Sequence, residues 1–316
     1  MTSLLALAVP LLAGCDSLSG STAPKTAFDA AAAMSYTRAQ LAFGPRIPGT
    51  PGATKAGDWI VTMMRERADT VIEQRWMHRT ANGDSLPLRN VLARFKPAAA
   101  QRILYLVHWD TRPRADNDPV LGNRNLPVPG ANDGAAGVGL LIALGDALKK
   151  TPPSVGVDLL FVDGEDYGPS FDPPYVDVLL GSQYFAKNLP SPGYRPIFGV
   201  LWDMIADAEL NLLQEGNSVS AAPEVVSRVW QRAADLGYDR WFIPRQGQNI
   251  TDDHIPLIER GLRVIDVIDI DYGPLGADGR ARPDYHHTIN DTIERISQRS
   301  LQIVGDVALS LLMDTY

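Results

Sequence analysis

The segment VDLLFVDGEDYG (residues 157–168) joins an apolar run to two adjacent carboxylates, Glu165 and Asp166. Its first seven residues combine apolar, β-branched and aromatic side chains, which is typical of a buried strand. Glycines bracket the acidic pair and indicate the loop that follows the strand. The pair is either an acidic, solvated turn or half of a catalytic site at a strand end, where α/β proteins bind ligands.

Apolar runs of this kind recur and predict the core strands of one sheet, at residues 102–109, 157–163, 198–204 and 263–269. Two more strand-like runs, at residues 71–77 and 89–95, flank the turn residues Asn82 and Gly83 and predict an antiparallel hairpin. Helical patterns alternate with the strands, at residues 52–67, 134–150, 181–188, 223–236 and 297–313. We therefore expect an α/β fold. It would be a three-layer sandwich with a mixed, mostly parallel central sheet, helices on both faces and the antiparallel hairpin at one edge.

The composition describes an ordinary globular protein. Of its 316 residues, 45% are hydrophobic and 21% are charged, which is enough to bury a sizeable core. The formal net charge is -8 and no cluster of lysines and arginines stands out, so nucleic acid is excluded as a partner. Neither an internal repeat nor a second linker interrupts the pattern, and we expect residues 34–316 to form a single catalytic domain.

The N-terminal residues predict export and a lipid anchor. The apolar stretch at residues 4–12 is too short to span a bilayer and leads into small residues, as secretory signals do. The sequence LAGC that ends at Cys15, the only cysteine, is similar to a bacterial lipobox, in which the cysteine becomes lipidated. We expect a lipoprotein signal peptide at residues 1–15 and a flexible tether at residues 16–33. The protein would then lie at the periplasmic face of a membrane of the cell envelope, held only by its lipid. The alternative is an accidental apolar N-terminus.

Each core strand is followed by a potential metal ligand or proton carrier. His108 and Asp110 lie at the end of the first strand with the same side-chain parity, so both can face one pocket. The others are Asp133 in a glycine-rich turn, the pair at 165–166, Asp203, and the segments 251–257 and 284–292.

Histidines concentrate in the same segments. The chain has five, and all except His78 lie there, namely His108, His254, His286 and His287. Imidazole with carboxylate is the ligand set of a catalytic zinc, which takes about three protein ligands and keeps one position open. Mixed nitrogen and oxygen ligands also suit other divalent metals. The sequence contains no HExxH motif, which excludes the thermolysin-type arrangement.

Each of these residues has a plainer explanation when it is taken alone. His108 could be a hydrogen-bonded structural residue, and Asp133 could cap the helix that follows it. Asp203 could be a turn residue and Asp291 an acid at a helix start. Five acidic or imidazole groups at one end of one predicted sheet are nevertheless hard to explain separately, so we favour a site. We assign no role to His78, which lies on the hairpin.

Taken in chain order, the motifs His-x-Asp, Gly-Ala-x-Asp-Gly, Asp-Gly-Glu-Asp, Asp-Met and His-Thr resemble the co-catalytic zinc aminopeptidase family that includes the glutaminyl cyclases. The resemblance covers most of residues 44–292, including RIPGTPGA (46–53), LLGSQYFA (179–186) and DDHIPLIERGLRVI (252–265). The last two resemble glutaminyl cyclases more than general aminopeptidases.

The resemblance implies a role for each matching residue. The ligands of the main zinc would be Asp133, Asp166 and His287. In relatives with two metals, His108 and Asp203 would hold the second ion and Asp133 would bridge both. Glu165 would be the general acid and base, and Asp253 would join it and Asp203 in a hydrogen-bonded acid network.

The sequence departs from the family pattern at two positions. The metal-binding member of the acidic pair is usually glutamate, and Asp166 is one methylene shorter. The residue before the ligand histidine is a tryptophan in animal cyclases, whereas it is His286 here. The shape of the substrate pocket and the choice between His286 and His287 as ligand are therefore open at this point.

Three functions are compatible with these residues. The first is a glutaminyl-peptide cyclotransferase with one zinc, which converts the N-terminal glutamine of peptides or proteins to pyroglutamate and releases ammonia. The second is an aminopeptidase with two zincs, in which Glu165 would deprotonate a water molecule. The third is a surface-anchored binding protein on an inactive enzyme scaffold.

Overall fold

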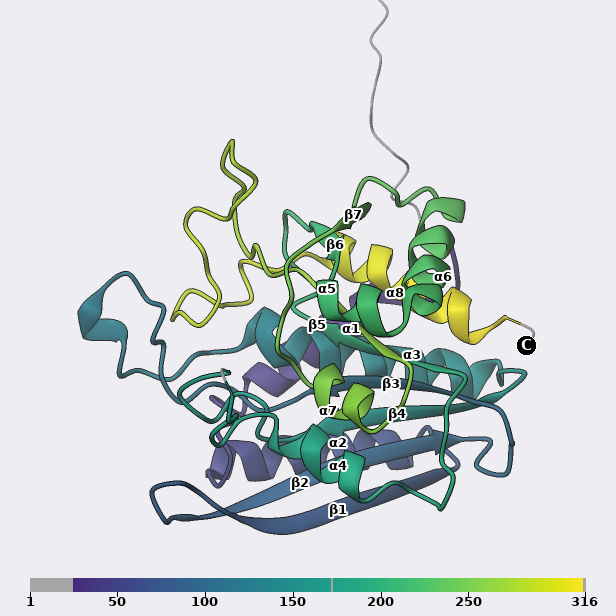
Figure 1. Cartoon of the computed structure of the whole chain (residues 1–316), viewed down its shortest axis with the longest axis horizontal. Coiled ribbons are helices and arrows are strands. Elements are labelled where there is room, and N and C mark those ends of the chain that lie inside the picture. The colour runs from purple at the N-terminus through teal and green to yellow at the C-terminus, as the bar shows by residue number, and fades with distance from the viewer. Residues whose placement is uncertain (1–24, 172, 315–316) are drawn as a thin grey trace, which may run out of the picture.

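A six-stranded mixed sheet forms the centre of the molecule (Figure 1). The structure, a computed structural model, describes residues 25–171 and 173–314. The strands lie in the order β1-β2-β4-β3-β5-β8. Their bounds are β1 (Thr70–Arg79), β2 (Ser85–Phe95), β3 (Arg102–His108), β4 (Gly156–Val162), β5 (Phe198–Asp203) and β8 (Val264–Ile268). The last four are mutually parallel, and the antiparallel hairpin β1–β2 forms one edge, as predicted.

Helices cover both faces of this sheet, which confirms the predicted three layers (Figure 1). Side chains alternate along β3: Ile103 and Tyr105 belong to the larger apolar cluster, and Leu104 and Leu106 to the smaller one. The larger cluster includes α1 (Ala30–Leu41), α2 (Pro51–Arg65), α3 (Gly137–Lys150), α6 (Pro223–Asp235) and α8 (Gln298–Leu312). The smaller one includes side chains of α4 (Leu180–Lys187) and α7 (His254–Glu259).

The sequence did not predict helix α1. Residues 30–33, which we assigned to the tether, form its first turn, and the side chain of Asp29 caps it by accepting a hydrogen bond from Ala32 N at 2.9 Å. Alanine-rich segments have high helix propensity but little hydrophobic contrast between faces, so the periodicity is weak. The predicted signal peptide and Cys15 lie outside the described residues. In the described part of the chain, no helix has the length and apolar character needed to cross a membrane.

Four smaller elements were also missed, one of which is the six-residue helix α7. A short parallel pair, β6 (Leu212–Gln214) and β7 (Phe242–Gln246), lies apart from the main sheet. The six-residue helix α5 (Gly216–Ala221) follows β6 and packs against β8. Elements this short carry too few residues for a periodic pattern to emerge.

A buried ion pair links neighbouring strands at the end of the sheet opposite the carboxyl ends of the parallel strands. Asp158 of β4 is completely buried and accepts hydrogen bonds from Arg102 Nε at 2.8 Å and Arg94 Nε at 3.0 Å. The hydroxyl of Tyr194 donates a further bond at 2.8 Å. Every oxygen of this carboxylate is therefore paired, which is the condition under which a buried charge is tolerated.

We predict that Asp158→Ala lowers the free energy of unfolding by about 3–5 kcal/mol, because it leaves a buried guanidinium without its partner. Denaturant unfolding measures this loss. The control is Glu224→Ala, which removes an exposed partner of Arg263 and should cost less than about 1 kcal/mol. Equal costs for the two variants would contradict the assignment.

Candidate active site

The residues singled out in the sequence meet at the carboxyl ends of the parallel strands. A cavity of about 350 Å³ opens there. Its acidic and imidazole lining consists of Asp133, Glu165, Asp203, Asp252, His286 and His287. Asp166 and Asp253 are fully buried beside it. The structure thus brings together groups that are up to 179 residues apart (His108 to His287).

A strained loop carries Asp133. The carboxylate of Asp291 accepts hydrogen bonds from Asp133 N at 3.2 Å and from the preceding backbone N–H at 2.8 Å. The next residue, Gly134, has a φ of +94°, and a Cβ there would lie 2.9 Å from Asp110 O. Asp133 does not cap the following helix, whose N-cap is Ala136. The capping alternative is therefore wrong, and the loop instead directs the Asp133 carboxylate into the site.

A second loop carries Glu165 and Asp166. The buried carboxylate of Asp110 accepts hydrogen bonds from Glu165 N at 3.1 Å and Asp166 N at 3.2 Å. From this turn, the Glu165 side chain lines the cavity. Arg112 Nη1 lies 2.6 Å from Asp166 Oδ1, whereas Asp166 Oδ2 is buried without a hydrogen-bond partner. The acidic pair therefore separates into one group at the cavity surface and one behind it.

Asp133, Asp166 and His287, the zinc ligands that the resemblance implies, lie close to one another. His287 Nε2 lies 3.3 Å from Asp166 Oδ1 and 3.7 Å from Asp133 Oδ2. Asp133 Oδ2 and Asp166 Oδ2 are both buried and have no hydrogen-bond partner. Burial and the neighbouring cationic groups hold the pKa of His287 well below its usual value, so its imidazole is neutral. Of the Asp166 oxygens, Oδ1 lies near His287 but is paired with Arg112, and Oδ2 is the unpaired one. Carboxylate oxygens beside a neutral imidazole are donors of the types that zinc takes. His286 also offers a nitrogen to a group with Asp133 and His287, within 4.8 Å.

A second group of possible ligands adjoins the first. His108 Nε2 lies 3.1 Å from Asp133 Oδ1 and 3.2 Å from Asp203 Oδ1, and the three residues can approach one ion. Asp133 belongs to both groups, which is the geometry that a bridging ligand requires. Burial opposes protonation of His108, but the carboxylates around it raise its pKa overall.

Several carboxylates surround Glu165 closely enough to affect its charge. Burial, together with the charges of Asp166, Asp252 and Asp253, raises the pKa of Glu165 well above its usual value. Burial likewise raises the pKa of Asp253 to about 7, although the hydroxyl of Ser182 donates a hydrogen bond to it. Asp253 can therefore hold a proton near neutral pH, and the pKa of Glu165 is shifted in the same direction, as suits a group that moves a proton during catalysis.

Asp110, Asp252 and Asp291 lie in segments that the sequence singled out but received no specific role there, and Arg112 was not predicted at all. Asp110 and Asp291 hold the two loops through backbone N–H groups, and Asp252 lines the cavity. Arg112 pairs with Asp166 and stacks over Phe171, another residue of the cavity wall. The parity of Asp110 with His108 was a usable signal. The contacts of Arg112 arise only where two loops meet and leave no local pattern.

Three kinds of comparison relate this chain to known proteins. The profile of peptidase family M28 matches residues 90–312, more than half of the chain. A glutaminyl-peptide cyclotransferase of Bos taurus is 25% identical over 295 residues, covering 83% of this chain and 76% of the bovine one. A Porphyromonas gingivalis glutaminyl cyclase is 37% identical with a TM-score of 0.84, covering 90% of this chain and 98% of that one. A leucine aminopeptidase precursor of Bacteroides thetaiotaomicron is 34% identical with a TM-score of 0.84, covering 92% and 98%. The expected zinc exopeptidase and cyclase fold is confirmed.

We predict that His287→Ala weakens zinc binding by about 100-fold or more, because it removes one donor of the ligand set. The matched control is the neighbouring variant His286→Ala, which should keep its zinc. Metal content after dialysis against a weak chelator, measured by atomic emission, distinguishes them. Zinc loss in His286→Ala with retention in His287→Ala would reverse the assignment.

Proposed function

Because the chain belongs to peptidase family M28, we propose that it is a zinc-dependent glutaminyl-peptide cyclotransferase. It would convert the N-terminal glutamine of peptides to pyroglutamate. The α-amine nitrogen forms a bond to the γ-carbonyl carbon, the bond from that carbon to the amide nitrogen breaks, and ammonia leaves. The bovine and Porphyromonas gingivalis relatives, both glutaminyl cyclases, support this assignment.

The observation that carries the proposal is the buried carboxylate of Asp253 beside Glu165. One oxygen of Asp253 accepts the Ser182 hydroxyl, and the other, Oδ2, is buried without a partner. Asp253 and Asp252 both raise the pKa of Glu165 by their charge. Closely spaced carboxylates cannot all ionise cheaply, so a proton is shared among them. A proton shared among carboxylates suits a reaction that moves a proton from one atom of the substrate to another.

Glu165 would carry that proton. It lines the cavity and can accept the proton that the α-amine loses as the ring closes. It would then give the same proton to the departing amide nitrogen. One zinc ion, held by Asp133, Asp166 and His287, would supply a Lewis acid for the γ-carbonyl oxygen. Ring closure is intramolecular, so holding the amine near the carbonyl lowers much of the barrier.

An aminopeptidase is the second candidate. The group of His108, Asp133 and Asp203 that could hold a second metal favours it. The leucine aminopeptidase precursor of Bacteroides thetaiotaomicron supports it too. In this case two zinc ions would bind and Glu165 would take its proton from water instead of an amine.

We predict that the metal-loaded protein forms pyroglutamate from Gln-initiated peptides, and that Glu165→Gln reduces kcat by about 100- to 10,000-fold without loss of zinc. Ammonia release and mass spectrometry of the product measure the activity. Glu224→Gln, the same change at an exposed surface position, is the control and should keep full activity. Release of leucine from Leu-initiated peptides, without pyroglutamate formation, would contradict the cyclase assignment and support the aminopeptidase.

We also propose that the protein is an exported lipoprotein of the cell envelope, anchored through Cys15. The support is the position of this single cysteine directly after a short apolar segment. We predict that Cys15→Ala abolishes incorporation of labelled palmitate during expression in bacteria and moves the protein from the membrane to the soluble fraction. Equal labelling of both proteins would contradict the anchor.

A further inference from the structure

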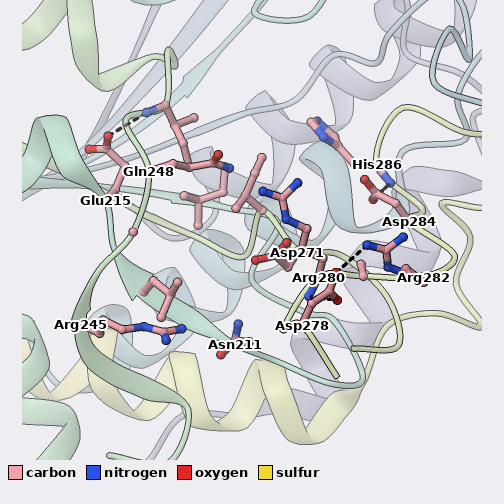
Figure 2. A pocket seen from close by; sticks show the side chains of 17 residues that line it. Asn211, Glu215, Arg245, Gln248, Asp271, Asp278, Arg280, Arg282, Asp284 and His286 are labelled. Atoms are coloured by element: carbon pink, nitrogen blue, oxygen red, sulfur yellow. Dashed lines mark hydrogen bonds and ion pairs between the residues drawn. The ribbon is translucent and has the colours of Figure 1, made fainter. Parts of the chain in front are cut away.

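A second pocket, larger than the candidate active site, opens next to it (Figure 2). Its volume is about 570 Å³, within the range of about 300–1,000 Å³ in which small ligands bind. The two cavities share part of their walls, namely Gln248, Ile250, Ile268, Ile270 and His286. A peptide whose first residue occupies the active site would therefore continue into this second pocket.

The second pocket is built from segments that the catalytic proposal leaves unused. One wall comes from β7 and the residues that follow it. The opposite wall is the segment 270–286, which contains the yellow-green loop projecting from the body of the molecule in Figure 1. Hydrogen bonds between its two arms, from Arg282 N to Pro274 O at 2.8 Å and from Tyr285 N to Tyr272 O at 2.9 Å, hold that loop in place.

Most charged groups of the second pocket are already paired. Arg282 forms an ion pair with Asp278 (Figure 2). Both carboxylate oxygens of Glu215 accept hydrogen bonds from backbone N–H groups, and Asp284 accepts one from His286 N at 2.9 Å. Arg282 and Glu215 therefore have partners already, whereas the bond from His286 N engages only Oδ1 of Asp284, whose other oxygen could attract a cation instead.

Two arginines are different. Within the residues that the structure describes, the guanidinium groups of Arg245 and Arg280 form neither an ion pair nor a hydrogen bond. Figure 2 shows Arg245 on one side of the pocket and Arg280 beside Asp271 on the other. Burial raises the pKa of Asp271, and the positive charges of Arg280 and Arg245 oppose this effect. The charges of both arginines act on Asp271, but neither guanidinium is held by a direct bond within the described part of the chain, so both remain available to a ligand carboxylate.

We propose that Arg245 and Arg280 bind a carboxylate of the peptide substrate downstream of its N-terminal glutamine. The proposal rests on the cyclase function and names its preferred substrates, namely peptides with an acidic side chain close behind the glutamine or short peptides with a free C-terminus. Guanidinium groups match carboxylates in geometry as well as in charge. His286, which lines both cavities, marks the point where the substrate passes from one to the other.

The test compares C-terminally amidated peptides that begin with glutamine and carry either glutamate or glutamine at the second, third or fourth residue. We expect at least one glutamate peptide to have a KM about 3- to 10-fold below its neutral counterpart with an unchanged kcat, because both arginines are exposed and such pairs are modest. Raising the salt concentration should shrink the difference. The same neutral peptides with a free C-terminus test the terminal carboxylate as the alternative source.

The double variant Arg245→Gln/Arg280→Gln should bring the KM ratio of acidic to neutral peptides to about 1 while neutral peptides are cyclised as before. Arg195→Gln is the matched control. Arg195 is also exposed, but it precedes β5 at the end of the sheet opposite the site, so the ratio should not change. Equal KM values in the unmodified protein, or a preference for lysine peptides through Asp271 and Asp284, would overturn the proposal.

Failure of the cyclase function would be distinguishable from failure of this pocket. If no Gln-initiated peptide is cyclised, the cyclase assignment fails. Calorimetric Kd values of the acidic and neutral peptides, for the unmodified protein and the double variant, still test the carboxylate site. If all peptides are cyclised with equal KM values, the cyclase assignment holds and the proposed carboxylate site in the second pocket is rejected.

Discussion

The hydrogen bonds that the Asp110 carboxylate accepts from the backbone of Glu165 and Asp166 are the interaction on which the site depends. Those two N–H groups lie in a buried turn, where an unpaired donor would cost about as much free energy as a lost hydrogen bond. Asp291 holds the loop of Asp133 in the same way. Asp110 and Asp291 take no part in the proposed chemistry, but they fix the backbone of the acidic residues that do. The side chains of those residues are then left to react.

The consequence is a large concentration of buried negative charge. Asp133, Glu165, Asp166 and Asp253 are all buried at one end of the sheet. Burial and neighbouring carboxylates raise the pKa of Glu165, Asp166 and Asp253. Burial acts in the same direction on Asp133, but the hydrogen bond and charge of His108 hold the pKa of Asp133 below its usual value. Arg112 offsets part of this charge at Asp166, and a bound divalent cation would offset more. In the proposed chemistry, the same cluster of acids would both attract a metal ion and keep a proton close to Glu165.

Sequence patterns predicted the parts of this arrangement that depend on one strand at a time. The buried runs of β3, β4, β5 and β8 are apolar because both faces are covered by helices, and their carboxyl ends carry the candidate ligands. Contacts between loops were not predictable. Arg112 reaches Asp166 across 54 residues, and the second pocket depends on how the segment 270–286 folds back toward β7. Contacts between such distant segments leave no periodic pattern in the sequence.

The separation of the two acidic neighbours also explains why one scaffold serves cyclases and aminopeptidases. Asp166 lies behind the cavity surface, and in the proposed chemistry it would hold the metal in either reaction. Glu165 faces the cavity, and the proton that it would accept depends on whether an amine or a water molecule is placed next to it. That choice is made by the shape of the pocket around the first residue and by the contacts that fix the rest of the peptide. A carboxylate held by Arg245 and Arg280 would fix the peptide from its far end, so the residues that select the substrate would be separate from those that move the proton.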